Sequence, residues 1–110
     1  MRKFHRKSGD RRLFLKSLTS NLIMRGKMET TEARAKEIRP RIERLVTIAK
    51  QQKLANLREL LARLPKESAE KLFYDIAPKY KDRHGGYLRI IKEAKTRKRD
   101  SAPKAIIEFI

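Results

Sequence analysis

Clustered cations are the residues of this sequence with the clearest capacity for chemistry. The 110 residues include 30 Lys and Arg against 13 Asp and Glu, which gives a formal net charge of +17. Cations held close together repel one another, so the sequence predicts a polyanion as partner. The first candidate contacts lie in a basic tail at the start of the chain: Arg2, Lys3, His5, Arg6 and Lys7.

A second basic cluster lies near the other end of the chain. Residues 28–65, between the clusters, are better balanced, with nine basic and five acidic residues. Cations at two poles suit a nucleic acid with phosphates on several sides better than one flat anionic membrane face. The candidate contacts that extend the first cluster are Arg11, Arg12, Lys16 and Arg25, and those of the second cluster are Lys95, Arg97, Lys98 and Arg99.

The segment from Asp82 to Tyr87 suggests a different kind of contact. Its two glycines permit positive φ angles and a close approach of the backbone to a ribose-phosphate. Tyr87 offers an aromatic face for base stacking and a hydroxyl for a 2′-OH or a phosphate. Packing of Tyr87 at the edge of the core is an equally weighted alternative. The candidate contacts here are Arg83, His84, Gly85 and Tyr87.

Enzyme chemistry has little support in the sequence. A hydrolase or transferase needs a nucleophile, a base and a stabilising group within reach of one another. The chain has two histidines, His5 and His84, and no cysteine. It also lacks the glycine-rich motifs that cradle phosphates of nucleotide cofactors. We therefore predict no catalytic residues, no metal site, no cofactor and no small-molecule substrate.

The same composition indicates where the protein acts. The absence of cysteine excludes disulfides and agrees with a reducing compartment. Uninterrupted apolar stretches reach three residues, which is far too short for a membrane span or a signal-peptide core. We expect a soluble, cytoplasmic protein with no membrane partner.

Apolar residues at helical spacing predict the elements that position these cations. The predicted helices cover residues 10–25, 31–52, 54–64 and 68–76. Asp10 and Thr31 are the predicted N-caps, and Gly26 is the predicted stop of the first helix. Pro40 removes one hydrogen-bond donor, so we expect a kink or a restart in the second helix.

β-Branched and apolar segments predict three short strands, over residues 27–30, 87–92 and 105–110. The last two are expected to form an antiparallel hairpin across the polar loop 95–103. The predicted class is α+β, a two-layer fold with a small three-stranded mixed sheet covered by helices. We predict a single domain over residues 10–110, preceded by the basic tail of residues 1–9.

Three stretches of the sequence resemble the bacterial-type large-subunit ribosomal protein seventeen family. Residues 30–39, TTEARAKEIR, resemble its TTxxxAKExR motif, and residues 45–50 resemble its LITLAK segment. Residues 71–90 are similar to its KLFxxIAPRYxDRxGGYTRV stretch. Arg34 and Lys36, within the first stretch, are further candidate RNA contacts.

This resemblance implies the element order α-β-α-α-α-β-β, which agrees with the order read from the residues. It also implies a structural protein of the large subunit, near the nascent-chain exit tunnel, bound to ribosomal RNA and neighbouring ribosomal proteins. The ribosome would be of bacterial type, in a bacterium or an organelle. The alternative from another class is a DNA-binding architectural or regulatory protein, which net charge alone does not exclude.

Overall fold

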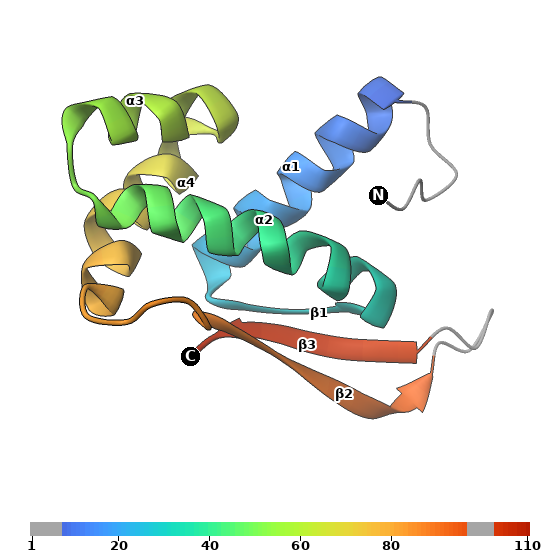
Figure 1. Cartoon of the computed structure of the whole chain (residues 1–110). Coiled ribbons are helices and arrows are strands. Elements are labelled where there is room, and N and C mark those ends of the chain that lie inside the picture. Colours follow the sequence, from blue (N-terminus) through green and yellow to red (C-terminus); the bar gives the residue numbers. More distant parts are fainter. Residues whose placement is uncertain (1–7, 97–102) are drawn as a thin grey trace.

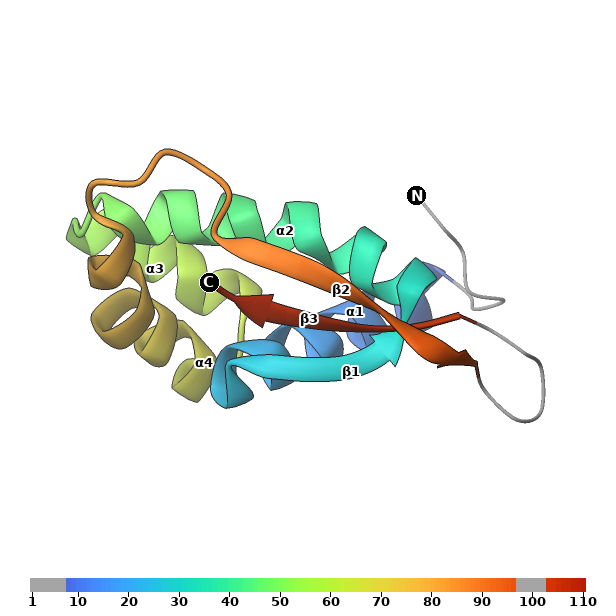
Figure 2. The same ribbon diagram turned by 90° about the horizontal axis from the view of Figure 1, so that it is seen from below.

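Helices cover one face of a three-stranded sheet, as Figures 1 and 2 show from two directions. The computed structural model describes the backbone of residues 8–96 and 103–110, and the side chains of residues 12–93 and 103–110. The elements are α1 (Ser8–Arg25), β1 (Lys27–Thr31), α2 (Glu32–Lys50), α3 (Leu54–Arg63), α4 (Lys66–Lys71), β2 (Leu88–Thr96) and β3 (Pro103–Phe109). The α+β class and the order of elements are as predicted.

Helix α1 ends where the sequence predicts and begins earlier. Gly26 has φ +83° and donates its N–H to the carbonyl of Leu22 at 2.8 Å, which closes the helix. The helix begins at Ser8, so the prediction that Asp10 is its N-cap is wrong. Asp10 instead lies inside the first turn of the helix.

Helix α2 is the central helix of the fold. The hydroxyl of Thr31 accepts a hydrogen bond from the N–H of Arg34 at 3.3 Å, which confirms the predicted N-cap. The helix does not restart at Pro40, because this residue lies on its exposed side, where water can satisfy the carbonyl that the proline leaves unpaired. The predicted apolar stripe is fully buried: Ala35, Ile38, Ile42, Leu45, Val46 and Ala49.

The predicted fourth helix is replaced by three short helical pieces. Helix α4 ends at Lys71, a π-helical turn follows over Leu72–Ile76, and a 3-10 turn extends to Tyr80. The helical path therefore passes through Pro78 and does not stop before it. Pro78 is tolerated because it lies in the first turn of the 3-10 segment, where its missing N–H has no helical partner.

The sheet has the order β1-β3-β2, and both pairs are antiparallel. The expectation of a mixed sheet is therefore wrong, because the central strand β3 runs opposite to both of its neighbours. Strand β2 extends to Thr96 with a register shift after Lys92, so Lys95 lies in a strand and not in the predicted loop. Pro103 begins β3, a position where a missing N–H is tolerated.

The described helices differ from membrane-spanning segments. Within residues 8–96 and 103–110, none of them combines the length and the apolar character that crossing a bilayer requires.

Candidate nucleic-acid interface

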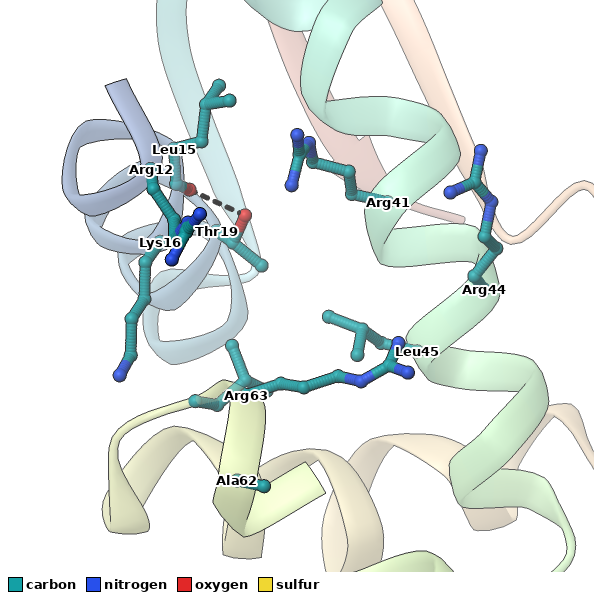
Figure 3. A pocket seen from close by; sticks show the side chains of 10 residues that line it. Arg12, Leu15, Lys16, Thr19, Arg41, Arg44, Leu45, Ala62 and Arg63 are labelled. Carbon is teal, nitrogen blue, oxygen red and sulfur yellow. Dashed lines mark hydrogen bonds between the residues drawn. The ribbon is translucent and has the colours of Figure 1, made fainter. Parts of the chain in front are cut away.

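Five cations surround a cleft between α1, α2 and the end of α3 (Figure 3). The cleft has a volume of about 350 Å³. Among the residues that the structure describes, no carboxylate lines it. We call it the basic cleft: its cations are Arg12, Lys16, Arg41, Arg44 and Arg63, and its floor is formed by Leu15, Thr19, Leu45, Ala62 and Leu64.

Helical spacing brings these side chains together. Arg12 and Lys16 are one turn apart on α1, and Arg41 and Arg44 are three residues apart on α2, so each pair shares one face of its helix. In Figure 3, Arg41 reaches from α2 toward α1. Arg63 reaches from the end of α3 toward the floor of the cleft. Arg12, Arg41 and Arg63, from three helices, thus face one opening, whereas Lys16 and Arg44 line it but direct their charged ends away from it (Figure 3).

The three leucines of the cleft floor belong to the hydrophobic core. Leu15, Leu45 and Leu64 are 1%, 6% and 3% exposed, so their backbones are held by packing. The N–H of Leu64 donates to the carbonyl of Leu60 at 2.8 Å, which fixes the end of α3. The hydroxyl of Thr19 is used within α1, where it donates to the carbonyl of Leu15 at 2.8 Å. The packing of the core therefore determines the position of the cleft floor.

Arg63 has an acidic partner outside the cleft. The guanidinium of Arg63 lies 3.0 Å from the carboxylate of Glu59, one turn earlier on α3. Both side chains are about half exposed, and exposed pairs of this kind contribute only about 0–1 kcal/mol. A phosphate can therefore draw Arg63 from this pair at little cost.

Tyr87 lies in the core, which is one of the two roles that the sequence left open for it. Its side chain is 2% exposed and packs against Tyr80, with ring centroids 5.2 Å apart. The hydroxyl accepts from the ammonium of Lys50 at 2.8 Å and donates to the carbonyl of Arg83 at 3.1 Å. The core-edge alternative is the correct one, since no face of the ring is open to a base.

The backbone explains why Tyr87 turns inward. Gly85 and Gly86 have φ angles of +80° and +64°, so both adopt the positive φ angles that the sequence permits. Directly after them, the carboxylate of Glu43 accepts from the N–H groups of Tyr87 and Leu88 at 3.4 and 3.3 Å. These bonds fasten the turn to α2 and direct the ring into the core.

Burial and hydrogen bonding act in opposite directions on Tyr87. Burial raises the pKa of its hydroxyl, whereas the hydrogen bond from Lys50 lowers it, with smaller contributions from other bonds. The net effect is a pKa below the ordinary value for tyrosine. The ammonium of Lys50 therefore favours the phenolate while it holds the ring in place.

The remaining predicted contacts lie at other places on the surface. Arg83 and His84 are exposed at the turn before β2, beside Gly85. Arg25 is exposed in the last turn of α1. Arg11 and Lys95 are placed by their backbones only, in α1 and β2. The predicted contacts that lie outside the described residues are Arg2, Lys3, His5, Arg6, Lys7, Arg97, Lys98 and Arg99.

The two predicted contacts at the start of α2 already have partners. Lys36 lies 2.7 Å from Glu32 and, chiefly through this hydrogen bond, lowers the pKa of that carboxyl. Lys92 of β2 lies 3.4 Å from the same carboxylate. The guanidinium of Arg34 lies 4.9 Å from the centre of the Phe14 ring, a cation–π contact between α2 and α1.

The structure therefore brings two predicted contacts, Arg12 and Lys16, to the lining of the basic cleft; the other predicted contacts whose side chains it describes lie outside the cleft. Sequence reasoning missed Arg41, Arg44 and Arg63. Their spacing along α2 and α3 is that of an ordinary solvated helix face, so the sequence carried no signal that three helices would bring them to the lining of one cleft.

Comparisons with known proteins agree with the family resemblance. A family model described as Ribosomal protein L17 matches residues 14–110. A Large ribosomal subunit protein bL17 from Lactobacillus helveticus is 41% identical, and the match covers 99% of this chain and 98% of the relative. Proteins of the same name from Sphingopyxis alaskensis and Thermoanaerobacter pseudethanolicus are 48% and 46% identical; each match covers 99% of this chain, with 78% and 97% of the respective relative. A match of this extent shows that the chain belongs to the ribosomal protein L17 family.

Proposed function

We infer that this chain is a structural protein of the large ribosomal subunit, where it binds folded ribosomal RNA and contacts neighbouring ribosomal proteins. The observation that carries this proposal is the family match over residues 14–110. The net charge of +17 and the basic cleft support an RNA partner. Ribosomal proteins of this kind are structural, so the chain is not an enzyme.

Neutralisation of phosphates is the mechanism that the charges support. RNA segments repel one another, and cations placed between them allow a closer approach. The described cations lie on separate parts of the fold: the basic cleft, the turn at Arg83 and the exposed strand β2 with Arg89 and Lys92. We propose the tail and the cluster Arg97–Arg99 as further contacts, so that one protein holds several RNA segments.

A position near the nascent-chain exit tunnel is the finer part of the proposal, and it rests on the family resemblance. Crosslinking tests it directly. A photoreactive residue placed at Lys79, which is exposed, should crosslink to a nascent polypeptide on stalled ribosomes if that side faces the exit. The same photoreactive residue can be placed at positions on several faces of the protein. If all of them crosslink to RNA or ribosomal proteins and none to the nascent polypeptide, the protein lies elsewhere on the subunit.

Incorporation into particles tests the proposal as a whole. A tagged chain produced in a bacterium should sediment with large subunits through a high-salt gradient, together with their RNA. A chain of the same composition in scrambled order is the control, because it separates incorporation from adsorption driven by charge. Recovery of the native-order chain with chromosomal DNA, or at the top of the gradient, would contradict the proposal.

A further inference from the structure

We propose that the basic cleft binds a bulged, unpaired nucleotide of RNA, with the flanking phosphates on its cationic rim and the base over its apolar floor. This inference rests on the proposed function, because it names the kind of RNA element that one particular site takes. It is argued from the shape of the cleft, from its chemistry and from its rigidity.

Shape separates a bulge from a regular duplex. The cleft is concave, encloses about 350 Å³ and has walls from three helices. The backbone of an RNA duplex is convex, so its phosphates can reach the rim of such a cleft but not its floor. An unpaired nucleotide projects from the helix and can enter. Proteins that read RNA sequence or local shape mostly bind such projecting elements.

Chemistry points to a ligand with an anionic and an apolar part. The rim carries Arg12, Arg41 and Arg63, whose guanidinium groups can fork onto phosphates or stack on a base. The apolar surface open in the cleft comes from Ala62 and from the aliphatic stems of the cations, because the floor leucines are only 1–6% exposed, and the Thr19 hydroxyl is already used within α1. A phosphate buried on this floor would lose its water without gaining donors, which is unfavourable. The flat face of a base suits the floor, and its phosphates suit the rim.

Rigidity makes the cleft selective. Its floor residues Leu15, Leu45 and Leu64 are core residues, so the opening exists before any ligand arrives. A preformed site avoids part of the ordering cost of binding. It also cannot flatten to accept a duplex, because that would require α1 to separate from α2.

The test fills the cleft without changing its charge. Ala62 lines the cleft and is exposed, so Ala62→Phe places a ring over the floor. Ala55→Phe is the matched control, since Ala55 is exposed on the same helix and is not among the residues that line the cleft. The probes are an RNA hairpin with one bulged nucleotide, with each of the four bases in turn, and the same hairpin fully paired. Full-length protein is used throughout, and thermal unfolding checks that each variant folds.

The wild-type chain should prefer at least one bulged hairpin over the paired one by about fivefold or more, the lower limit for one stacked base. Ala62→Phe should abolish this preference and leave affinity for the paired hairpin unchanged, whereas Ala55→Phe should retain it. The double change Arg41→Gln and Arg63→Gln should also reduce the preference. Its control, Arg58→Gln with Lys79→Gln, removes the same amount of charge outside the cleft and should lower the affinity for the bulged and the paired hairpin equally.

Other results would overturn the inference. If the wild-type chain binds bulged and paired hairpins equally, or if both phenylalanine variants behave alike, the cleft is not a nucleotide site while RNA binding still stands. If no RNA binds better than duplex DNA, the proposed function itself fails. A third result would also contradict the inference. If the wild-type chain shows no preference for bulged hairpins but binds a polyglutamate peptide, and the double change Arg41→Gln and Arg63→Gln abolishes this peptide binding, the cleft takes an acidic protein segment instead.

Discussion

The ammonium of Lys50 donates a hydrogen bond of 2.8 Å to the hydroxyl of Tyr87, and this bond joins the last turn of α2 to the entry of β2. The same ammonium lies 5.0 Å from the centre of the Tyr87 ring and also donates to the carbonyl of Arg83. An aromatic residue that looks like a contact for RNA thus fastens the helical layer to the sheet. Its removal should affect folding before it affects binding.

Tyr87→Phe should lower the free energy of unfolding by about 0.5–1.5 kcal/mol, because it removes one hydrogen-bond partner of Lys50 and keeps the buried ring. Tyr87→Ala should cost about 3–5 kcal/mol, as for other large aromatic side chains truncated in a core. Urea unfolding measures both. RNA affinity of the folded Tyr87→Phe protein should equal that of the wild type; a large loss of affinity at unchanged stability would restore the base-stacking role.

Stability should depend on buried leucines and hardly at all on exposed ones. Leu72 is fully buried, and Leu72→Ala should lower the free energy of unfolding by about 2–5 kcal/mol. Leu54 is 62% exposed, so Leu54→Ala is the matched control and should change it by about 0.5 kcal/mol or less. Replacement of Arg97, Lys98 and Arg99 by Gln should also have a small effect. A greater loss from this triple change than from Leu72→Ala would mean that charge, not packing, maintains the fold.

Acid should weaken one ion-pair cluster of the fold. The hydrogen bond from Lys36 is the main cause that holds the pKa of Glu32 below its ordinary value, and Lys92 adds to it. A carboxyl with a lowered folded-state pKa contributes stability above its unfolded-state pKa, about 4.3 for a glutamate. This contribution is lost as the pH falls through the lower, folded-state value.

The variant Glu32→Gln isolates this effect. Urea midpoints measured over a series of pH values should fall less steeply on the acid side for Glu32→Gln than for the wild type, and the two profiles should run parallel near neutral pH. Parallel profiles over the whole range would show that the cluster contributes nothing to folding.

Salt should weaken RNA binding steeply, because each neutralised phosphate releases counterions. Contacts to roughly six to ten phosphates would lower affinity by about 10³–10⁵ between 50 and 200 mM salt on the scale known for duplex DNA. Replacement of Arg2, Arg6 and Lys7 by Gln should reduce the slope of log affinity against log salt. Folded ribosomal RNA should bind more tightly than duplex DNA of equal length, and a tighter, sequence-selective complex with DNA would favour the DNA-binding alternative.

Sequence patterns predicted the helical layer well where one face of a helix meets one core. The stripe from Ala35 to Ala49 is fully buried as its spacing indicates, and Thr31 and Gly26 mark ends that depend on local backbone chemistry. Predictions were weaker where contacts among several elements together decide the conformation of the chain. The π and 3-10 turns over Leu72–Tyr80 follow α4, and the spacing of apolar residues does not distinguish these helical types from an α-helix.

The candidate site was predicted only in part for a similar reason. Charge count predicts a polyanionic partner, and Arg12 and Lys16 follow from the first cluster. A cleft, however, depends on how α1, α2 and α3 cross, and this is decided by the packing of Leu15, Leu45 and Leu64. For Tyr87, by contrast, the sequence suggested a contact and the structure buries the side chain. An aromatic residue beside two glycines suggests a binding loop until its burial is known.

Strand β3 follows β1 and β2 along the chain, so it is synthesised after them, yet it is the middle strand of the sheet. Met28 pairs with Ile107, and Ile90 pairs with the same residue from the other side. Until the C-terminal segment is released, β1 and β2 have no strand to pair with, and Ala105 and Ile107 are missing from the core. Completion of the sheet therefore waits until β3 has been synthesised, and loss of residues 103–110 would leave two strands that never meet.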